Sequence, residues 1–106
     1  MDHLTQIFIN LDHLTHNMNL LQTLAGPRPL LPAIKANGYG HGAEIMGRHL
    51  IGLGYDTLCV AHVSEGAELV RAGLKAEFIV LSASLPESAQ EFVKYAFEPA
   101  ICTIEM

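Results

Sequence analysis

The stretch LLPAIKANGYGHG, residues 30–42, joins an apolar run to a glycine-rich turn, with one lysine between them. An uninterrupted apolar run is typical of a parallel strand that is covered on both faces. The alternating glycines that follow permit positive φ angles and sharp changes of direction. We therefore expect a buried strand over 30–36, a turn over 37–42 and a helix that begins at Ala43.

The same alternation of strand and helix extends in both directions from this stretch. Apolar residues that recur three or four positions apart alternate with short apolar runs bounded by Gly, Pro or Asp. Asp12 and Ser64 are the expected N-caps of two of the helices. The expected helices cover 12–25, 43–53, 65–72 and 86–95, and the expected strands cover 7–11, 30–36, 57–62, 77–82 and 99–103.

Parallel strands joined by helical crossovers suit two α/β architectures. One is an open, doubly wound sheet, and the other is part of a (β/α)8 barrel. A complete barrel needs about 250 residues, so a chain of 106 residues supplies about three and a half βα units. The pattern alone leaves both architectures open.

Composition limits the classes of protein to which this chain can belong. Its length of 106 residues fits one domain at most. Its hydrophobic content of 50% is typical of a folded chain and not of a disordered one. Eleven Asp and Glu outnumber six Lys and Arg, so we expect no nucleic-acid partner. No apolar run reaches the length of about 20 residues that a membrane span needs, and the start MDHLTQIF lacks a basic secretory signal. Cys59 and Cys102 are expected as reduced thiols, which favours a cytoplasmic location.

Lys35 lies at the expected carboxyl end of a parallel strand, where α/β enzymes place their chemistry. A lysine amine there can form a Schiff base with an aldehyde, and the Tyr39 hydroxyl can bind a phosphate. The next helix begins at Ala43 and offers N–H groups to an anion. These groups suit pyridoxal phosphate, which carries an aldehyde and a phosphate. The alternative is a lysine whose stem covers the strand end while its ammonium reaches solvent.

Residues 35–42, KANGYGHG, resemble the pyridoxal-phosphate attachment signature of bacterial alanine racemases. The opening segment 9–14 with Asn17 is similar to the first strand and helix of that family. Further similar positions are Val60, Ala61, Glu65, Ala67, Glu68, Leu69, Arg71, Gly73, 79–81 and 99–106. The resemblance implies the N-terminal portion of a pyridoxal-phosphate-binding, TIM-like (β/α)8 barrel over residues 1–106, with the family's C-terminal β domain absent.

The resemblance also implies roles for two residues. Lys35 would attach pyridoxal 5′-phosphate and act as a catalytic base, and Tyr39 would bind the phosphate of the cofactor. The family is an isomerase that interconverts L-alanine and D-alanine, supplies D-alanine for peptidoglycan and acts as a homodimer in the cytoplasm. Its second base and its pyridine-binding arginine have no counterpart here, so we expect the 106-residue chain to be inactive alone.

Three alternatives to an alanine racemase remain open at this point. The chain could bind pyridoxal phosphate without turnover, or it could be an inactive remnant. It could also belong to a racemase of serine or of another small amino acid, because the residues that shape the substrate pocket lie largely outside this chain.

The remaining titratable residues receive structural interpretations. His13 and His16 lie three apart on one helix, and two histidines without a third ligand do not make a metal site. His41 is expected to hold the glycine-rich loop. Three acidic residues lie in first turns of helices, where carboxylates complement the helix dipole: Glu44, Glu65 and Glu68.

Overall fold

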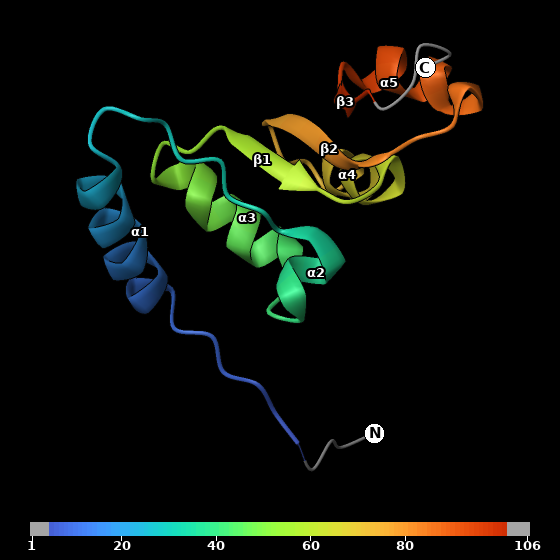
Figure 1. Cartoon of the computed structure of the whole chain (residues 1–106). Coiled ribbons are helices and arrows are strands. Elements are labelled where there is room, and N and C mark those ends of the chain that lie inside the picture. Colours follow the sequence, from blue (N-terminus) through green and yellow to red (C-terminus); the bar gives the residue numbers. More distant parts are fainter. Residues whose placement is uncertain (1–4, 102–106) are drawn as a thin grey trace.

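A computed structural model describes residues 5–101 of the chain, and helices alternate there with parallel strands (Figure 1). In chain order the elements are α1 (Leu11–Ala25), α2 (Lys35–Tyr39), α3 (Ala43–Gly52), β1 (Thr57–Val60), α4 (Val63–Arg71), β2 (Glu77–Ala83), the 3-10 helix η1 (Pro86–Ser88), α5 (Ala89–Tyr95) and β3 (Glu98–Ala100). Among these residues, no helix is long and apolar enough to cross a bilayer.

The strands form a parallel sheet in the order β1-β2-β3. β1 pairs with β2 from Thr57 opposite Glu77 to Val60 opposite Val80. β2 pairs with β3 through Ile79 opposite Glu98, and the register shifts before the last pair. The expectation of an α/β fold with parallel strands is confirmed. The expected strand over 99–103 begins one residue earlier, and its residues 102–103 lie outside the described part of the chain.

The segment over 30–36 lies beside β1 as expected, but it is not a full strand. Ala33 forms a single parallel bridge with Cys59. The Ile34 N–H donates to the Cys59 carbonyl at 2.9 Å, and the Cys59 N–H donates to the Pro32 carbonyl at 2.8 Å. Pro32 has no N–H to extend the ladder, and the chain enters α2 at Lys35. The expectation of a strand that ends at Ala36 was therefore wrong in extent.

The expected strand over 7–11 was also wrong. Residues 5–10, before α1, run away from the sheet and pair with none of the described strands (Figure 1). A strand needs backbone hydrogen bonds to a neighbouring strand, and this segment has no such neighbour among the described strands. The side chains of Ile7 and Phe8 are accordingly largely exposed. Asn10, not Asp12, caps α1, because its Oδ1 accepts the N–H groups of Asp12 and His13 at 2.9 and 3.2 Å.

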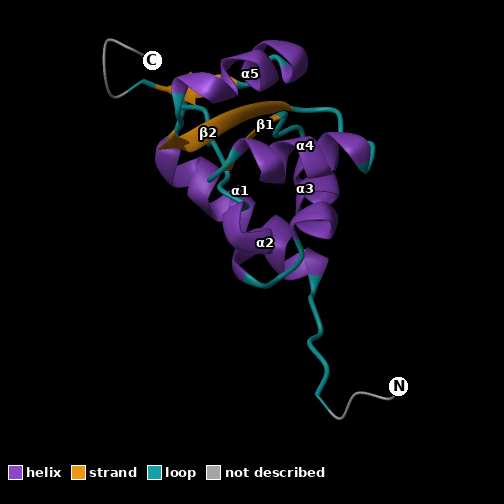
Figure 2. Cartoon of the chain, turned by 90° about the vertical axis from the view of Figure 1, so that its right-hand side faces the viewer, coloured by secondary structure: helices purple, strands orange, loops and turns teal. Residues whose placement is uncertain are grey.

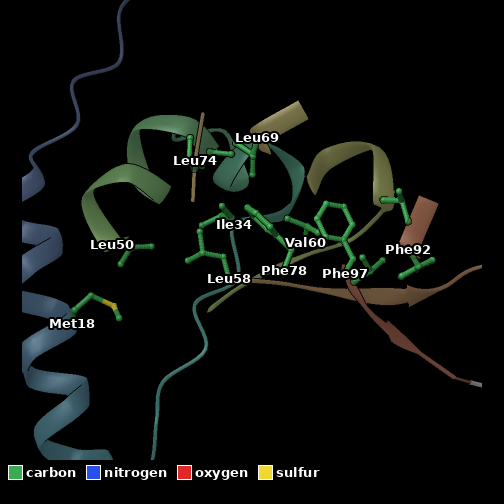
Figure 3. Close-up of a cluster of buried hydrophobic side chains, with 13 residues drawn as sticks. Met18, Ile34, Leu50, Leu58, Val60, Leu69, Leu74, Phe78, Phe92 and Phe97 are labelled. Carbon is green, nitrogen blue, oxygen red and sulfur yellow. The ribbon is translucent and has the colours of Figure 1, made fainter. Parts of the chain in front are cut away.

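Helices α1, α3 and α4 lie on one side of β1 and β2 (Figure 2). The side chains at alternate strand positions point toward these helices and are fully buried, because a strand exposes successive side chains on opposite faces. These residues are Leu58, Val60, Phe78 and Val80. They form one apolar core with helix residues such as Leu50 and Leu69, and Phe97 joins it from the segment before β3 (Figure 3).

Candidate functional site

The carboxyl ends of the strands meet at one edge of the sheet. The Ile34 N–H bonds the Cys59 carbonyl, and the Ser82 N–H donates to the Ala61 carbonyl at 3.2 Å. Lys35 directly follows the bridged segment, and Ala61 directly follows β1. Lys35 therefore enters its turn at the edge where parallel α/β proteins collect functional groups.

A left-handed turn, not an ordinary helix, follows Lys35. Ala36, Asn37, Gly38 and Tyr39 have φ angles of 52°, 54°, 66° and 56°. The turn is closed by hydrogen bonds from the Gly38 N–H to the Ile34 carbonyl at 2.8 Å and from the Gly40 N–H to the Ala36 carbonyl at 3.2 Å. A residue with a side chain is disfavoured in this region by about 1–2 kcal/mol, so the surroundings must hold the turn.

Two side chains within the glycine-rich segment hold this turn. His41 Nδ1 lies 3.0 Å from the Gly38 carbonyl, to which it can only donate, and this confirms the expected structural role of His41. Asn37 Oδ1 accepts the Ala43 N–H at 2.9 Å. The first amide of α3 is therefore already bonded to Asn37 and is not among the N–H groups that the helix could offer to an anion.

Glu65 holds the turn from outside, a role that its expected place in the first turn of a helix does not reveal. Its Oε2 accepts the Ala36 N–H at 2.7 Å, and its Oε1 accepts the N–H groups of Ala61 and His62 at 2.6 and 3.1 Å. The N-cap of α4 is His62, and the helix begins at Val63. The expectation that Ser64 caps this helix was therefore wrong. A glutamate three residues after a cap is a recognised signal, but His62 is not a usual capping residue.

The environment of Glu65 favours its ionised form. Partial burial alone raises the pKa of the carboxyl, but the hydrogen bonds from Ala36, Ala61 and His62 and the charge of His62 outweigh this effect. The pKa of Glu65 therefore lies below its usual value. A charged acceptor makes each of these hydrogen bonds stronger than a neutral one.

The structure brings Lys35 and Tyr39 onto one turn. Lys35 is half-buried, whereas Lys75 and Lys94 are exposed, and Lys94 lies 5.2 Å from the centre of the Tyr95 ring. The side chain of Tyr39 is 60% exposed. Both residues thus follow the strand-end edge on one turn, and Lys35 is the less exposed of the two.

The other candidate groups near this edge have plain structural roles. Burial raises the pKa of the Cys59 thiol, and the negative charge of Glu98 raises it further, so this thiol is a poor nucleophile. The hollow behind the turn is lined by Glu44, Glu65 and Glu68, whose charges disfavour a phosphate. Within residues 5–101, no three potential metal ligands gather into a cluster.

Comparisons with known proteins give one consistent result. The family model for the alanine racemase N-terminal domain matches residues 9–106. The alanine racemase of Desulforamulus reducens is 39% identical over 88 residues, which cover 82% of this chain and 24% of that protein. The chain therefore spans about a quarter of the length of this relative.

Solved structures agree with the sequence comparison. Alanine racemase of Clostridium difficile 630 superimposes with a TM-score of 0.80 at 30% identity, over 88% of this chain and 25% of that one. Alanine racemase of Bartonella henselae, described with covalently bound pyridoxal phosphate, has a TM-score of 0.76 at 24% identity over 86% of this chain and 26% of that one. The fold is the N-terminal portion of a TIM-like barrel, and the chain belongs to the alanine racemase N-terminal domain family.

Proposed function

We propose that this chain carries the lysine that attaches pyridoxal 5′-phosphate in a racemase that interconverts L-alanine and D-alanine. The observation that carries the proposal is the position of Lys35. Lys35 is a half-buried residue at the strand-end edge, and a left-handed turn that includes Tyr39 follows it. The alanine racemases that match this chain supply the substrate class.

The side chains on this turn fit the chemistry of the cofactor. Pyridoxal phosphate needs an amine for its aldehyde and hydrogen-bond donors for its phosphate, and Lys35 and the exposed Tyr39 hydroxyl are such groups. No carboxylate is bonded to either of these two side chains in the described structure. When bound, the cofactor withdraws electrons and so acidifies the Cα–H bond of the amino acid.

Each residue of the turn has a distinct task in this proposal. Lys35 Nζ would hold the cofactor covalently through its aldehyde and would take the Cα proton of D-alanine. The Tyr39 hydroxyl would donate a hydrogen bond to the phosphate and so hold the cofactor at that end. Asn37 and His41 keep the turn in its left-handed form, so both functional groups are presented before the ligand arrives.

The wider setting of the reaction is part of the same proposal. We place this chain within a longer barrel domain of a homodimeric, cytoplasmic enzyme that supplies D-alanine for peptidoglycan. The length of the relatives supports the larger domain. Because the second base belongs to later parts of the family's chains, the 106-residue chain alone should show no sustained turnover in a coupled D-alanine assay.

Borohydride reduction in the presence of pyridoxal phosphate, followed by peptide mapping, tests the proposal directly. Lys75 and Lys94 are exposed internal controls for random labelling. We expect the adduct to form preferentially on Lys35 and to fall to the level of the controls in a Tyr39→Phe or unfolded sample. Equal labelling of the three lysines in the native chain would overturn the proposal.

A further inference from the structure

A single carboxylate joins two segments that are far apart in the sequence. Glu65 Oε2 is bonded to the N–H of Ala36, which lies 29 residues earlier, and Glu65 Oε1 is bonded to the two N–H groups that follow β1. The first segment carries Lys35, and the second is the carboxyl end of a core strand. Glu65 therefore bridges the proposed reactive turn and the rigid sheet.

The Ala36 N–H has a specific need for this partner. Ile34 is the N-cap of α2, so the Ala36 N–H is one of the first amides of this element and has no acceptor within it. Ala36 is also the first residue of the left-handed turn, with φ at 52°. The carboxylate thus satisfies the amide at the point where the backbone changes hand, directly after Lys35.

We propose that Glu65 is a positioning residue for Lys35, because its carboxylate fixes the backbone of the lysine's turn to the end of β1. This inference rests on the proposed function of Lys35. An N-terminal cap for α4 alone would use only Oε1, with the amides of Ala61 and His62. The bond from Oε2 to Ala36 lies outside that role and ties the lysine's backbone to the cap.

The variants Glu65→Gln and Glu65→Ala test this assignment, with Glu68→Gln as the matched control. A glutamine has one acceptor oxygen and an NH2 group that cannot accept, so it can serve only one of the two segments. Glu68 lies on the same helix and lines the same hollow, but it is exposed. Two readouts are measured: the ratio of Lys35 to Lys75 labelling by pyridoxal phosphate with borohydride, and amide hydrogen exchange at Ala36.

We expect Glu65→Ala to lower the Lys35 labelling ratio and to speed exchange at Ala36 by roughly tenfold each, the size expected when a hydrogen bond to a charged group is lost. Glu65→Gln should lie between Glu65→Ala and the native chain, and Glu68→Gln should match the native chain. Amide protection in β1 and β2 is measured in parallel. If it is unchanged, a loss of the whole fold cannot account for the shift.

The two readouts separate this inference from the proposed function. If the native chain labels Lys35 selectively and Glu65→Ala does so equally, the positioning role is wrong and the function stands. If the native chain shows no selectivity, the function is wrong, and exchange at Ala36 still decides the role of Glu65 as the anchor of the turn. If the rate of amide exchange at Ala36 is the same in Glu65→Ala as in the native chain, Glu65 does not anchor the turn either.

Discussion

Three residues with side chains adopt left-handed backbone angles directly after Lys35, namely Ala36, Asn37 and Tyr39. Each such residue costs about 1–2 kcal/mol relative to an ordinary helical conformation. Such strain persists only where the surroundings hold it, and it gathers at functional sites. Here Glu65 and the Asn37 side chain supply the restraint, so the local cost is offset by hydrogen bonds that also shape the site.

Substitutions of Asn37 should separate the hydrogen bond from the rest of the side chain. Asn37→Ala removes the acceptor for the Ala43 N–H, and alanine tolerates left-handed angles less well than asparagine. We expect the free energy of unfolding to fall by about 1–2 kcal/mol in a denaturant titration. Asn37→Asp keeps an oxygen at the same place and should stay within about 0.5 kcal/mol of the native chain. Equal losses in both variants would contradict this view of the turn.

The stability that Glu65 provides should depend on pH in one direction. Its pKa is lower in the folded state than in the unfolded state, so its contribution is full above the unfolded pKa and disappears as the pH falls through the folded pKa. At neutral pH we expect Glu65→Gln to lose about 1–3 kcal/mol of unfolding free energy. The difference from the native chain should shrink in acid, below the usual glutamate range near about 4.3. Denaturant titrations at neutral and acidic pH measure it, and a difference that grows in acid would contradict the assignment.

The sequence predicts candidate site residues more readily than the contacts that hold them in place. Lys35 and Tyr39 could be proposed as site residues because the signature KANGYGHG is local, and His41 could be given its structural role for the same reason. The bond from Glu65 to Ala36 could not be found, because it depends on a contact between residues 29 positions apart. The left-handed angle at Ala36 was unforeseen for a related reason, since alanine does not favour it.

At the scale of the elements, helices were easier to predict than strands. The helix over 12–25 needs only its own periodicity, and the structure starts it one residue earlier. The strands over 57–62 and 77–82 were placed well because β1 and β2 pair with each other. The segments over 7–11 and 30–36 have similar composition but lack a full set of partners, so no amount of local apolar character makes them complete strands.

Close packing between α4 and the segment before β3 depends on Gly66. A Cβ atom at this position would lie 2.8 and 2.9 Å from two carbons of the Phe97 ring. The ring has little room to move, because it stacks on Tyr95 with centroids 5.1 Å apart and meets the edge of Phe78 at 5.5 Å. The helix can therefore approach the sheet only with glycine at this position.

Gly66→Ala should destabilise the chain although alanine is the better helix former. We expect a loss of about 1–3 kcal/mol in unfolding free energy from the overpacked core, measured by denaturant titration. Gly52→Ala is the matched control, because a Cβ at the end of α3 would meet nothing within 4 Å. It should be neutral or stabilising by up to about 1 kcal/mol. A similar response of both variants would show that the Phe97 contact is not limiting.

The described part of the chain is more open than a closed domain of similar length. Its Cα radius of gyration is 15.3 Å, whereas a compact domain of this size has about 13 Å. Helices α1, α3 and α4 lie on one side of β1 and β2 (Figure 2). Several large apolar side chains of the described residues remain exposed. Three of them surround a hollow beside α5, where Leu85, Val93 and Ile101 are 72%, 82% and 61% exposed. This openness fits a portion of a barrel better than a closed sheet.

An apolar surface of this kind should drive the isolated chain to associate as its concentration rises. Val93→Lys places a charge in the hollow beside α5, and we expect it to shift the chain toward the monomer in sedimentation velocity runs over a concentration series. Gln90→Lys makes the same change in net charge, from −5 to −4, on the same helix but starts from an exposed polar residue. It should associate like the native chain. If both variants shifted equally toward the monomer, charge repulsion would explain the effect. If the native chain stayed monomeric over the whole concentration series, this apolar surface would not drive association.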